Sequence, residues 1–173
     1  MGIAAVQLAR AAGLQVIGSA GTDRGLDLVL EQGAHHVLDH TEEGSLAELN
    51  ALTAGKGVNV ILERLAKVNL GNDLNFLARG GRVLPIGNRG GNSQGHVEIN
   101  PRAVMVRDED ILGMTLYNAS AQQQKGFRAA IVAGLANATL QPVIGQEFSL
   151  EEVVKAHHAV IDNRAYGKIV LIP

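Results

Sequence analysis

The sequence predicts an α/β fold in which helices cover both faces of a doubly wound parallel sheet. Short apolar runs alternate with helical patterns of about 8–15 residues through the first half of the chain, as in βαβ crossovers. Glycine accounts for 21 of the 173 residues, and aromatic residues make up only 3%. Aliphatic strands and alanine-rich helices separated by glycine are typical of this fold class.

The first half of the chain follows this alternation closely. Residues 3–12 predict a helix with one charge, Arg10, and with Gly13 at its end; it is too apolar to lie on an open surface. An apolar run over residues 14–18 predicts a strand, and Thr22 can cap a helix that continues to Gly33. The elements expected next are a strand over 36–39, a helix from the capping box Ser45–Glu48 to Gly55, and strands over 58–62 and 82–86 on either side of a helix over 70–78.

The second half departs from strict alternation. Residues 87–95 have linker composition, and Pro85 just before them suggests an unpaired or bulged strand position. Asn100 and Pro101 form a good cap and first turn for a helix to Arg107. The remaining predictions are an extended segment over 97–99, a strand over 111–116, a helix over 121–135, an apolar stretch at 141–144, a helix from the capping box Ser149–Glu152 to Asp162, and a strand over 168–172.

The apolar run over residues 111–116 is expected to form an edge strand. It contains no lysine or proline that would prevent edge-to-edge pairing. We therefore expect this strand to pair with the same strand of a second chain, which gives a homodimer or homotetramer.

Composition excludes several classes of function. With 15 basic and 17 acidic residues and no basic run, the chain is not expected to bind nucleic acid. The absence of cysteine excludes a disulfide scaffold and thiolate zinc sites. No apolar run approaches the roughly 18 residues of a membrane span, and no basic region precedes the first apolar stretch, so we expect no membrane partner and a cytoplasmic location. The adjacent pairs at 35–36 and 157–158 are poorly spaced for chelation, so no metal site is assigned.

In a parallel sheet, ligands bind at the carboxyl ends of the strands, where the strand order reverses. Small, polar and glycine residues dominate these positions. They are Ser19-Ala20-Gly21-Thr22, Asp39-His40, Glu63-Arg64, Gly87-Asn88-Arg89 and Thr115-Leu116.

An ordered set of motifs across the chain resembles the zeta-crystallin-type quinone oxidoreductases of the medium-chain dehydrogenase/reductase superfamily. The motifs are Gly18-Ser19-Ala20-Gly21-Thr22, Gly33-Ala34-His35, Val60-Ile61-Leu62-Glu63, Leu65-Ala66, Val68-Asn69-Leu70, Gly80-Gly81-Arg82-Val83, Val97-Glu98-Ile99-Asn100-Pro101-Arg102 and Gly167-Lys168-Ile169. The resemblance implies a Rossmann-like sheet and zinc-independent hydride transfer from NADP(H) to a quinone or enone. It also implies dimers built by joining two sheets.

The same resemblance implies that the fold is incomplete at its start. Gly2 would be the last glycine of the glycine-rich pyrophosphate loop, while the first strand and the earlier glycines are missing. We expect these to be encoded upstream of Met1, and we expect the 173-residue chain to bind NADPH weakly or not at all. Residues 1–138 would form the NADP-binding domain, and residues 139–173 would return to a GroES-like catalytic domain.

Cofactor-binding residues also follow from the resemblance, and most of them lie at predicted strand ends. They are Gly2, Gly21, His40, Asn69, Ile86, Gly87, Asn88, Arg89, Met114, Thr115 and Leu116. Four have a plain alternative: Gly21 as a turn glycine, His40 as a solvated loop residue, Asn69 as a helix N-cap, and Arg89 as a surface charge. No catalytic residue is assigned.

The predicted strand over residues 14–18, which is the second strand of a complete Rossmann fold, ends without the acidic residue that holds the ribose of NAD. Ser19 and Ala20 stand where an Asp or Glu would bind the 2′-hydroxyl, so NADP is favoured. Arg24 is a candidate partner for the 2′-phosphate, with an exposed helix arginine as the alternative. The alternative function for the whole chain is a non-catalytic family member with a structural or oligomerisation role; RNA binding is less favoured.

Overall fold

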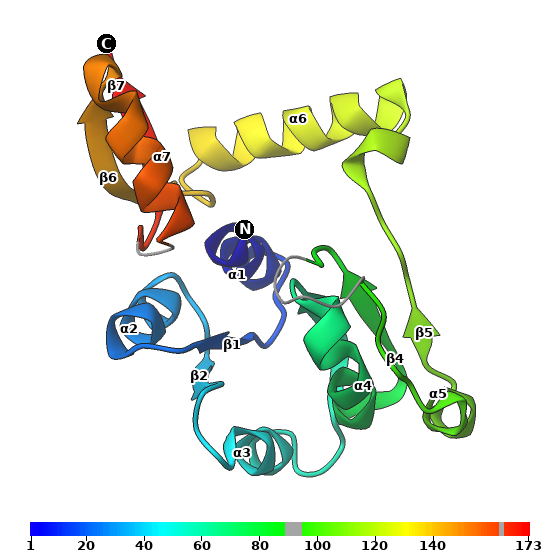
Figure 1. Ribbon diagram of the computed structural model, residues 1–173. Helices are drawn as coiled ribbons and strands as arrows, with labels where there is room; N and C mark the ends of the chain where they lie inside the picture. The colour runs from blue at the N-terminus through cyan, green and yellow to red at the C-terminus, as the bar shows by residue number, and fades with distance from the viewer. Residues whose placement is uncertain (89–94, 163–164) are drawn as a thin grey trace. The chain divides into compact units, whose positions relative to one another are not determined.

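The computed structural model describes residues 1–88, 95–162 and 165–173 of the chain (Figure 1). It confirms the α/β class, because helices alternate with strands that pair in parallel. The chain forms two compact units. Unit 1 consists of Met1–Ser45 together with Lys125–Pro173, and unit 2 consists of Leu46–Gln124. The domain boundary at residue 138 remains a prediction.

Unit 1 contains two parallel strand pairs and the helices next to them. β1 pairs with β2 from Ile17 opposite His36 to Ala20 opposite Asp39, and β6 pairs with β7. A small core of Val6, Val16 and Ala34 holds its N-terminal part together. The elements are α1 (Gly2–Ala11), β1 (Ile17–Ala20), α2 (Asp23–Glu31), β2 (His36–Asp39), most of α6 (Ala121–Ala136), β6 (Ile144–Ser149), a short 3₁₀ helix (Leu150–Glu152), α7 (Val153–Ile161) and β7 (Lys168–Ile172).

Two local signals in unit 1 are confirmed. The side chain of Thr22, the N-cap of α2, accepts a hydrogen bond from the N–H of Gly25. Ser149 and Glu152 form the predicted capping box, although a 3₁₀ turn precedes α7. In both cases the polar side chain satisfies an N–H group that the helix itself leaves without a partner.

Two expectations for unit 1 are wrong, and one strand is not predicted. β1 begins at Ile17 rather than residue 14, because the N–H of Leu14 returns to Ala9 and closes the end of α1. α1 is not a buried helix: Val6 is its one buried residue, and Leu8 is 49% exposed. β6 is not predicted by the sequence, because its residues Ile-Gly-Gln-Glu-Phe-Ser include a glycine and two long polar side chains.

Unit 2 is built around a three-stranded parallel sheet in the order β3–β4–β5. α4 and α5 pack against β4 (Figure 1). The core consists of Ala66, Leu70, Leu74, Leu77 and Val83, and Leu74, Leu77 and Val83 are almost fully buried. The elements are α3 (Ser45–Leu52, whose first residue belongs to unit 1), β3 (Val58–Glu63), α4 (Ala66–Phe76), β4 (Leu77–Pro85), α5 (Pro101–Arg107), β5 (Asp110–Ile111) and a 3₁₀ turn (Leu116–Asn118).

The boundary between α4 and β4 differs from the prediction. α4 starts at Ala66 and stops at Phe76, whereas the sequence predicts a helix over 70–78. Leu77 already pairs with Val58, and the register shifts before Val60 pairs with Arg82. Pro85 is the last residue of β4, beyond the two positions where β4 pairs with β5, so its missing N–H breaks no pairing with β5.

The predicted strand over 111–116 is wrong in most of its length. β5 comprises only Asp110 and Ile111, and the last ladder bond is donated by Leu112 to the carbonyl of Val83. Residues 113–115 have no regular structure, since β4 offers β5 partners only at Arg82 and Val83. Residues 97–99 likewise form no strand.

Among the helices described here, none is long and apolar enough to cross a membrane.

Candidate functional site

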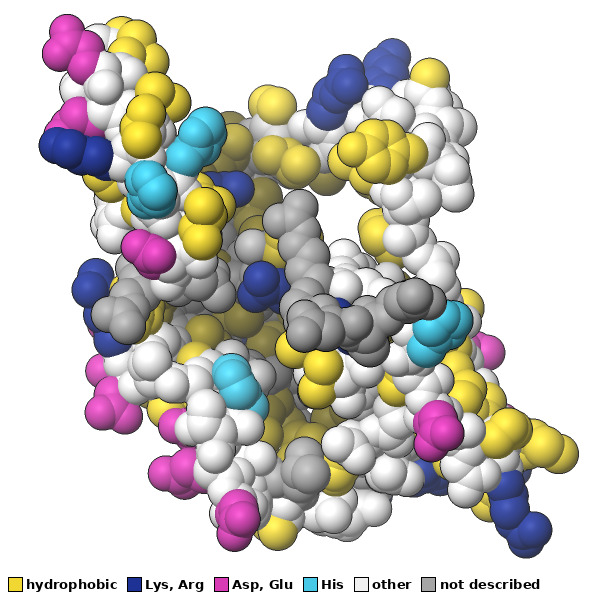
Figure 2. Space-filling model, in the orientation of Figure 1, with side chains coloured by type: hydrophobic (Ala, Val, Ile, Leu, Met, Phe, Trp, Pro, Cys, Tyr) yellow, Lys and Arg dark blue, Asp and Glu magenta, His cyan; other side chains and the backbone are white. Residues whose placement is uncertain are grey.

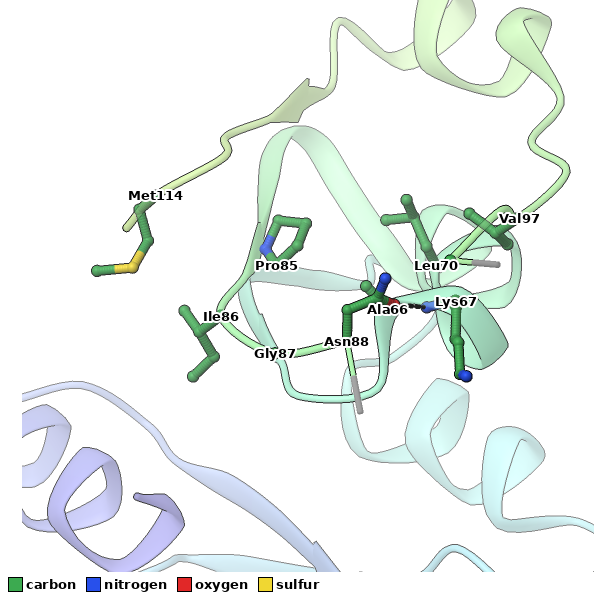
Figure 3. A pocket seen from close by; sticks show the side chains of 10 residues that line it. Ala66, Lys67, Leu70, Pro85, Ile86, Gly87, Asn88, Val97 and Met114 are labelled. Carbon is green, nitrogen blue, oxygen red and sulfur yellow. Dashed lines mark hydrogen bonds between the residues drawn. The ribbon is translucent and has the colours of Figure 1, made fainter. Parts of the chain in front are cut away.

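Unit 2 contains an open pocket of about 390 Å³ at the carboxyl end of β4. Three segments surround it: the residues that end and follow β4, the first turns of α4, and parts of the chain before α5 and after β5 (Figure 3). The lining residues are Ala66, Lys67, Leu70, Pro85, Ile86, Gly87, Asn88, Gly95, Val97 and Met114. This is the position at which ligands bind to parallel sheets.

Hydrogen bonds fasten the segment after β4 to the start of α4. The side-chain Oδ1 of Asn88 accepts the N–H of Lys67 at 2.9 Å, which is the dashed line in Figure 3. The N–H of Ala66 donates to the carbonyl of Gly87 at 3.2 Å, and Asn88 forms an isolated bridge with Leu65. Asn88 thus acts as a cap from outside the helix, since Leu65 at the N-cap position gives no side-chain hydrogen bond.

Gly87 allows the chain to pass close to the turn before α4. A Cβ at this position would lie 2.5 Å from the carbonyl oxygen of Arg64, closer than any side chain tolerates. Glycine is therefore required here by close backbone approach.

The pocket combines an apolar wall with one cationic residue. Figure 3 shows Ile86 and Met114 on one side and Leu70 and Val97 on the other. Lys67 lies at the first turn of α4, where the helix dipole also favours negative charge. An apolar surface with a few polar groups is typical of a small-molecule site, and Lys67 suits this one to a ligand that carries an anionic group.

The pocket brings together four of the residues that the resemblance assigns to the cofactor: Ile86, Gly87, Asn88 and Met114. Thr115 and Leu116 follow Met114 in unit 2 but do not line the pocket, and Leu116 is 63% exposed. Arg89 lies outside the described residues.

Two further predicted residues, Gly21 and His40, lie together in unit 1. A Cβ on Gly21 would lie 2.9 Å from the methyl group of Thr41 and 3.0 Å from Nε2 of His40. Both residues follow the ends of the paired strands β1 and β2. Beside them, the hydroxyl and then the backbone N–H of Thr41 hold the pKa of Asp39 below its usual value.

Gly2, the remaining predicted cofactor residue in unit 1, is the first residue of α1. A Cβ added there would meet no atom within 4 Å. Its cofactor role remains a prediction.

Asn69 is found neither in the pocket nor at a helix N-cap, the two positions expected for it. It is not a helix N-cap, because α4 begins at Ala66, and it does not line the pocket. Its amide Nδ2 lies 3.3 Å from each carboxylate oxygen of Glu63, the last residue of β3. The carboxylate of Glu63 also accepts the N–H of Leu65. Glu63 therefore joins the end of β3 to the first turns of α4.

Arg24 is exposed, as the plain alternative for it expects, but its guanidinium is not isolated. It stacks over the ring of Tyr166, 4.4 Å from the ring centroid. The hydroxyl of Tyr166 lies 3.3 Å from that of Thr22 at the start of α2. This stacking still leaves the N–H donors at the edge of the guanidinium plane available to an anion.

Sequence reasoning misses Lys67, Leu70 and Val97 as pocket residues. Lys67 and Leu70 belong to the segment after β3, in which Asn69 is the one residue that the sequence analysis assigns to the cofactor. The signal that could have found Lys67 is its place in the first turn of a helix that directly follows a strand end. Val97 opens one of the motifs that carry the resemblance, but the motif gives it no cofactor role.

The residues described by the structure contain no cluster of three or more His, Cys, Asp or Glu side chains that could hold a metal ion. The whole sequence contains no cysteine.

Comparison with known proteins gives a consistent result. The family described as "Zinc-binding dehydrogenase" matches residues 1–133. The quinone oxidoreductase of Sus scrofa is 43% identical over 173 residues, covering 99% of this chain and 51% of that protein. The quinone oxidoreductase of Homo sapiens is 40% identical over 173 residues, which again cover 99% of this chain and 51% of that protein. The chain thus spans about half the length of the curated relatives it matches.

Solved structures agree with this result. A quinone oxidoreductase from Thermus thermophilus, reported also in complex with NADPH, superposes with a TM-score of 0.83 at 28% identity, covering 98% of this chain and 53% of that one. An NAD-dependent alcohol dehydrogenase gives a TM-score of 0.85 at 27% identity, covering 99% and 47%. The chain belongs to the zinc-binding dehydrogenase family of the medium-chain dehydrogenase/reductase superfamily, and within it is similar to the quinone oxidoreductases.

Proposed function

We propose that this chain forms the nicotinamide-cofactor part of an NADPH-dependent quinone oxidoreductase, a cytoplasmic homo-oligomer that reduces a quinone or enone. The observation that carries the proposal is the pocket at the carboxyl end of β4, where Ile86, Gly87, Asn88 and Met114 meet. It is supported by the likeness to a relative whose reported structures include a complex with NADPH.

The residues of this chain would bind and orient the cofactor. NADPH, when bound, supplies the hydride, and the protein determines where the nicotinamide lies. Lys67 would attract an anionic group of the cofactor, and Asn88 would keep the segment after β4 against α4. A ring of the cofactor would be covered by apolar side chains that exclude water from it. These side chains are Leu70, Ile86, Val97 and Met114.

A preference for NADPH over NADH is part of the proposal. Ser19 and Ala20 at the end of β1 carry no negative charge that would repel a 2′-phosphate. In the same unit, Arg24 stacks its guanidinium over the ring of Tyr166 and is our candidate for the phosphate contact.

NADPH titration of Asn88→Asp tests the proposal. Aspartate keeps the acceptor for the N–H of Lys67 but adds a negative charge beside the pocket. We expect the unmodified chain to bind NADPH weakly and saturably, with a dissociation constant above the low micromolar range. We expect Asn88→Asp to weaken binding about tenfold, equivalent to about 1.4 kcal/mol. Fluorescence of the reduced nicotinamide gives the measurement.

Asn72→Asp is the matched control, because Asn72 is an exposed residue of α4 that does not line the pocket. It should leave the dissociation constant unchanged. The proposal is wrong for this chain if NADPH does not bind saturably, or if both substitutions weaken binding equally.

A further inference from the structure

Two carboxyl groups of unit 2 lie near each other outside the lining of the pocket. Glu63 ends β3 and is buried, at 8% exposure. Asp73 lies one turn after Asn69 on the same face of α4, and Asn69 contacts Glu63, so the carboxyl group of Asp73 is within reach of that of Glu63. The Oδ2 atom of Asp73 is buried as well. Neither side chain lines the pocket, and the cofactor site described above makes no use of Asp73.

The two carboxyl groups can form a hydrogen bond with each other only if one of them carries a proton. Glu63 accepts the N–H of Leu65 and the amide of Asn69. No N–H or O–H group of the described residues reaches the Oδ2 of Asp73. Two ionised carboxylates possess only acceptors, so their contact would be repulsive. A proton on Asp73 turns the same contact into a donated hydrogen bond, and Glu63 already has the donors that stabilise its charge.

The electrostatics of the site agree with this assignment. Burial, then the charge of Glu63, then the hydrogen bond to Glu63 raise the pKa of Asp73 from an ordinary 3.8 to about 7.

The cations on neighbouring elements do not oppose this shift. On β4, Arg79 pairs with Asp108 and Arg82 is exposed. On α5, Arg102 is exposed, and Arg107 pairs with Glu109 and donates to the last carbonyls of α4. On α4 itself, Lys67 lies in the first turn, at the opposite end of the helix from those carbonyls. None of these cations contributes to the pKa of Asp73.

We propose that Asp73 and Glu63 share one proton and that this pair positions Asn69 at the carboxyl end of β3. The amide Nδ2 of Asn69 is held by the carboxylate of Glu63, which fixes the direction of the Asn69 side chain. Asp73 is thus a positioning residue that acts through Glu63. The effect on cofactor binding rests on the proposed function, whereas the sharing of the proton does not.

The pH dependence has a definite sign. A carboxyl group whose pKa is higher in the folded chain than in the unfolded chain stabilises the fold fully below the unfolded pKa. That stability is lost as the pH rises from about 4 to about 7, and the curve is level above about 7. In the same range, ionised Asp73 repels Glu63 and frees the amide of Asn69.

Asp73→Asn is the decisive variant, because an amide donates to Glu63 at every pH. In urea unfolding, we expect the midpoint of Asp73→Asn relative to the unmodified chain to increase between about pH 5 and about pH 7 and then to stay constant. Asp110→Asn removes a charge from an exposed carboxylate and should give a difference that does not vary with pH. Parallel pH curves for the unmodified chain and Asp73→Asn would overturn the proposal.

A second measurement follows Asn69 itself. Its side-chain amide signals in nitrogen–proton correlation spectra should shift with an apparent pKa of about 7 in the unmodified chain. In Asp73→Asn they should stay at their acidic position at every pH, and in Glu63→Gln the transition should move to lower pH. If Asp73→Asn does not fold, infrared difference spectra of the unmodified chain decide: a protonated carboxyl band that disappears above about pH 7 supports the pair, and its absence refutes it.

NADPH titrations across the same range separate the two proposals. If both hold, affinity declines above about pH 7 in the unmodified chain but not in Asp73→Asn. If NADPH never binds while the Asn69 signals still titrate, the proposed function fails and the proton-sharing pair stands. If NADPH binds with the same pH dependence in both chains and the Asn69 signals do not titrate, the pair is refuted and the proposed function stands.

Discussion

Gly87 shows how a single residue without a side chain determines the shape of the pocket. Its Cα lies so near the carbonyl of Arg64 that even a methyl group cannot fit without moving the backbone. We expect Gly87→Ala to lower the free energy of unfolding by about 1–3 kcal/mol, as overpacking does in well-packed sites. The same shift would move Asn88 away from α4 and weaken NADPH binding. Urea unfolding followed by circular dichroism measures the first effect.

Gly113→Ala is a suitable control for Gly87→Ala. It adds the same methyl group in the same unit, at a position where a Cβ meets no atom within 4 Å. We expect its effect on the free energy of unfolding to stay within about 0.5 kcal/mol. Equal effects of the two substitutions would contradict the steric explanation.

The residues of the pocket were partly predictable from the sequence. Gly87 and Asn88 directly follow an apolar run, and in a parallel sheet such positions face the ligand. The partnership of Glu63 with Asp73 was not predictable. It depends on the distance between the end of a strand and the second turn of the next helix. Neither the hydropathy pattern nor the spacing of the two residues in the sequence determines that distance.

At the scale of elements, α4 is the helix on which both the pocket and the core of unit 2 depend. Leu74 is 1% exposed and packs in the core of unit 2. We expect Leu74→Ala to lower the free energy of unfolding by about 2–5 kcal/mol, through lost burial and the cavity that remains. Val68→Ala on the same helix, where the side chain is 58% exposed, should change it by less than about 0.5 kcal/mol. A small effect of Leu74→Ala in urea unfolding would show that α4 does not anchor the unit.

Elements with a local signal were predicted well, and elements that depend on distant partners were not. Thr22, Asn100 and the box at Ser149 place helix starts correctly, because each cap is satisfied by its own helix. The run over 111–116 reads as a strand, but β4 pairs with it only near its start. β6 shows the opposite error: a mixed sequence becomes a strand because β7 provides the partner.

At the scale of the whole molecule, we still expect association through the free edge beside β5. Ile111 and Leu112 are partly exposed there, and Tyr117 is 96% exposed. Exposure alone does not identify an interface, since hydrophobic side chains also reach the surface over α5 and α7 (Figure 2). This edge combines apolar side chains with backbone groups that can extend a sheet.

Leu112→Lys should therefore reduce association, because it places a charge at this edge. Val106→Lys is the control: Val106 is 66% exposed on α5 in the same unit. Sedimentation velocity should show a dimer for the unmodified chain and for Val106→Lys, and a larger monomer fraction for Leu112→Lys. A monomeric unmodified chain at tens of micromolar would refute the interface.

The discontinuity of unit 1 has a consequence for how the protein is made. Gln7 exchanges hydrogen bonds with Gln141, and Thr22 contacts Tyr166, so segments more than 130 residues apart complete the same unit. On the ribosome, residues 46–124 of unit 2 are finished while Gln141 and Tyr166, the C-terminal partners of α1 and α2, do not yet exist. At about 5–20 residues per second, residues 125–173 require about 2–10 s more. During that time, the surface of residues 1–45 that residues 125–173 later cover stays exposed.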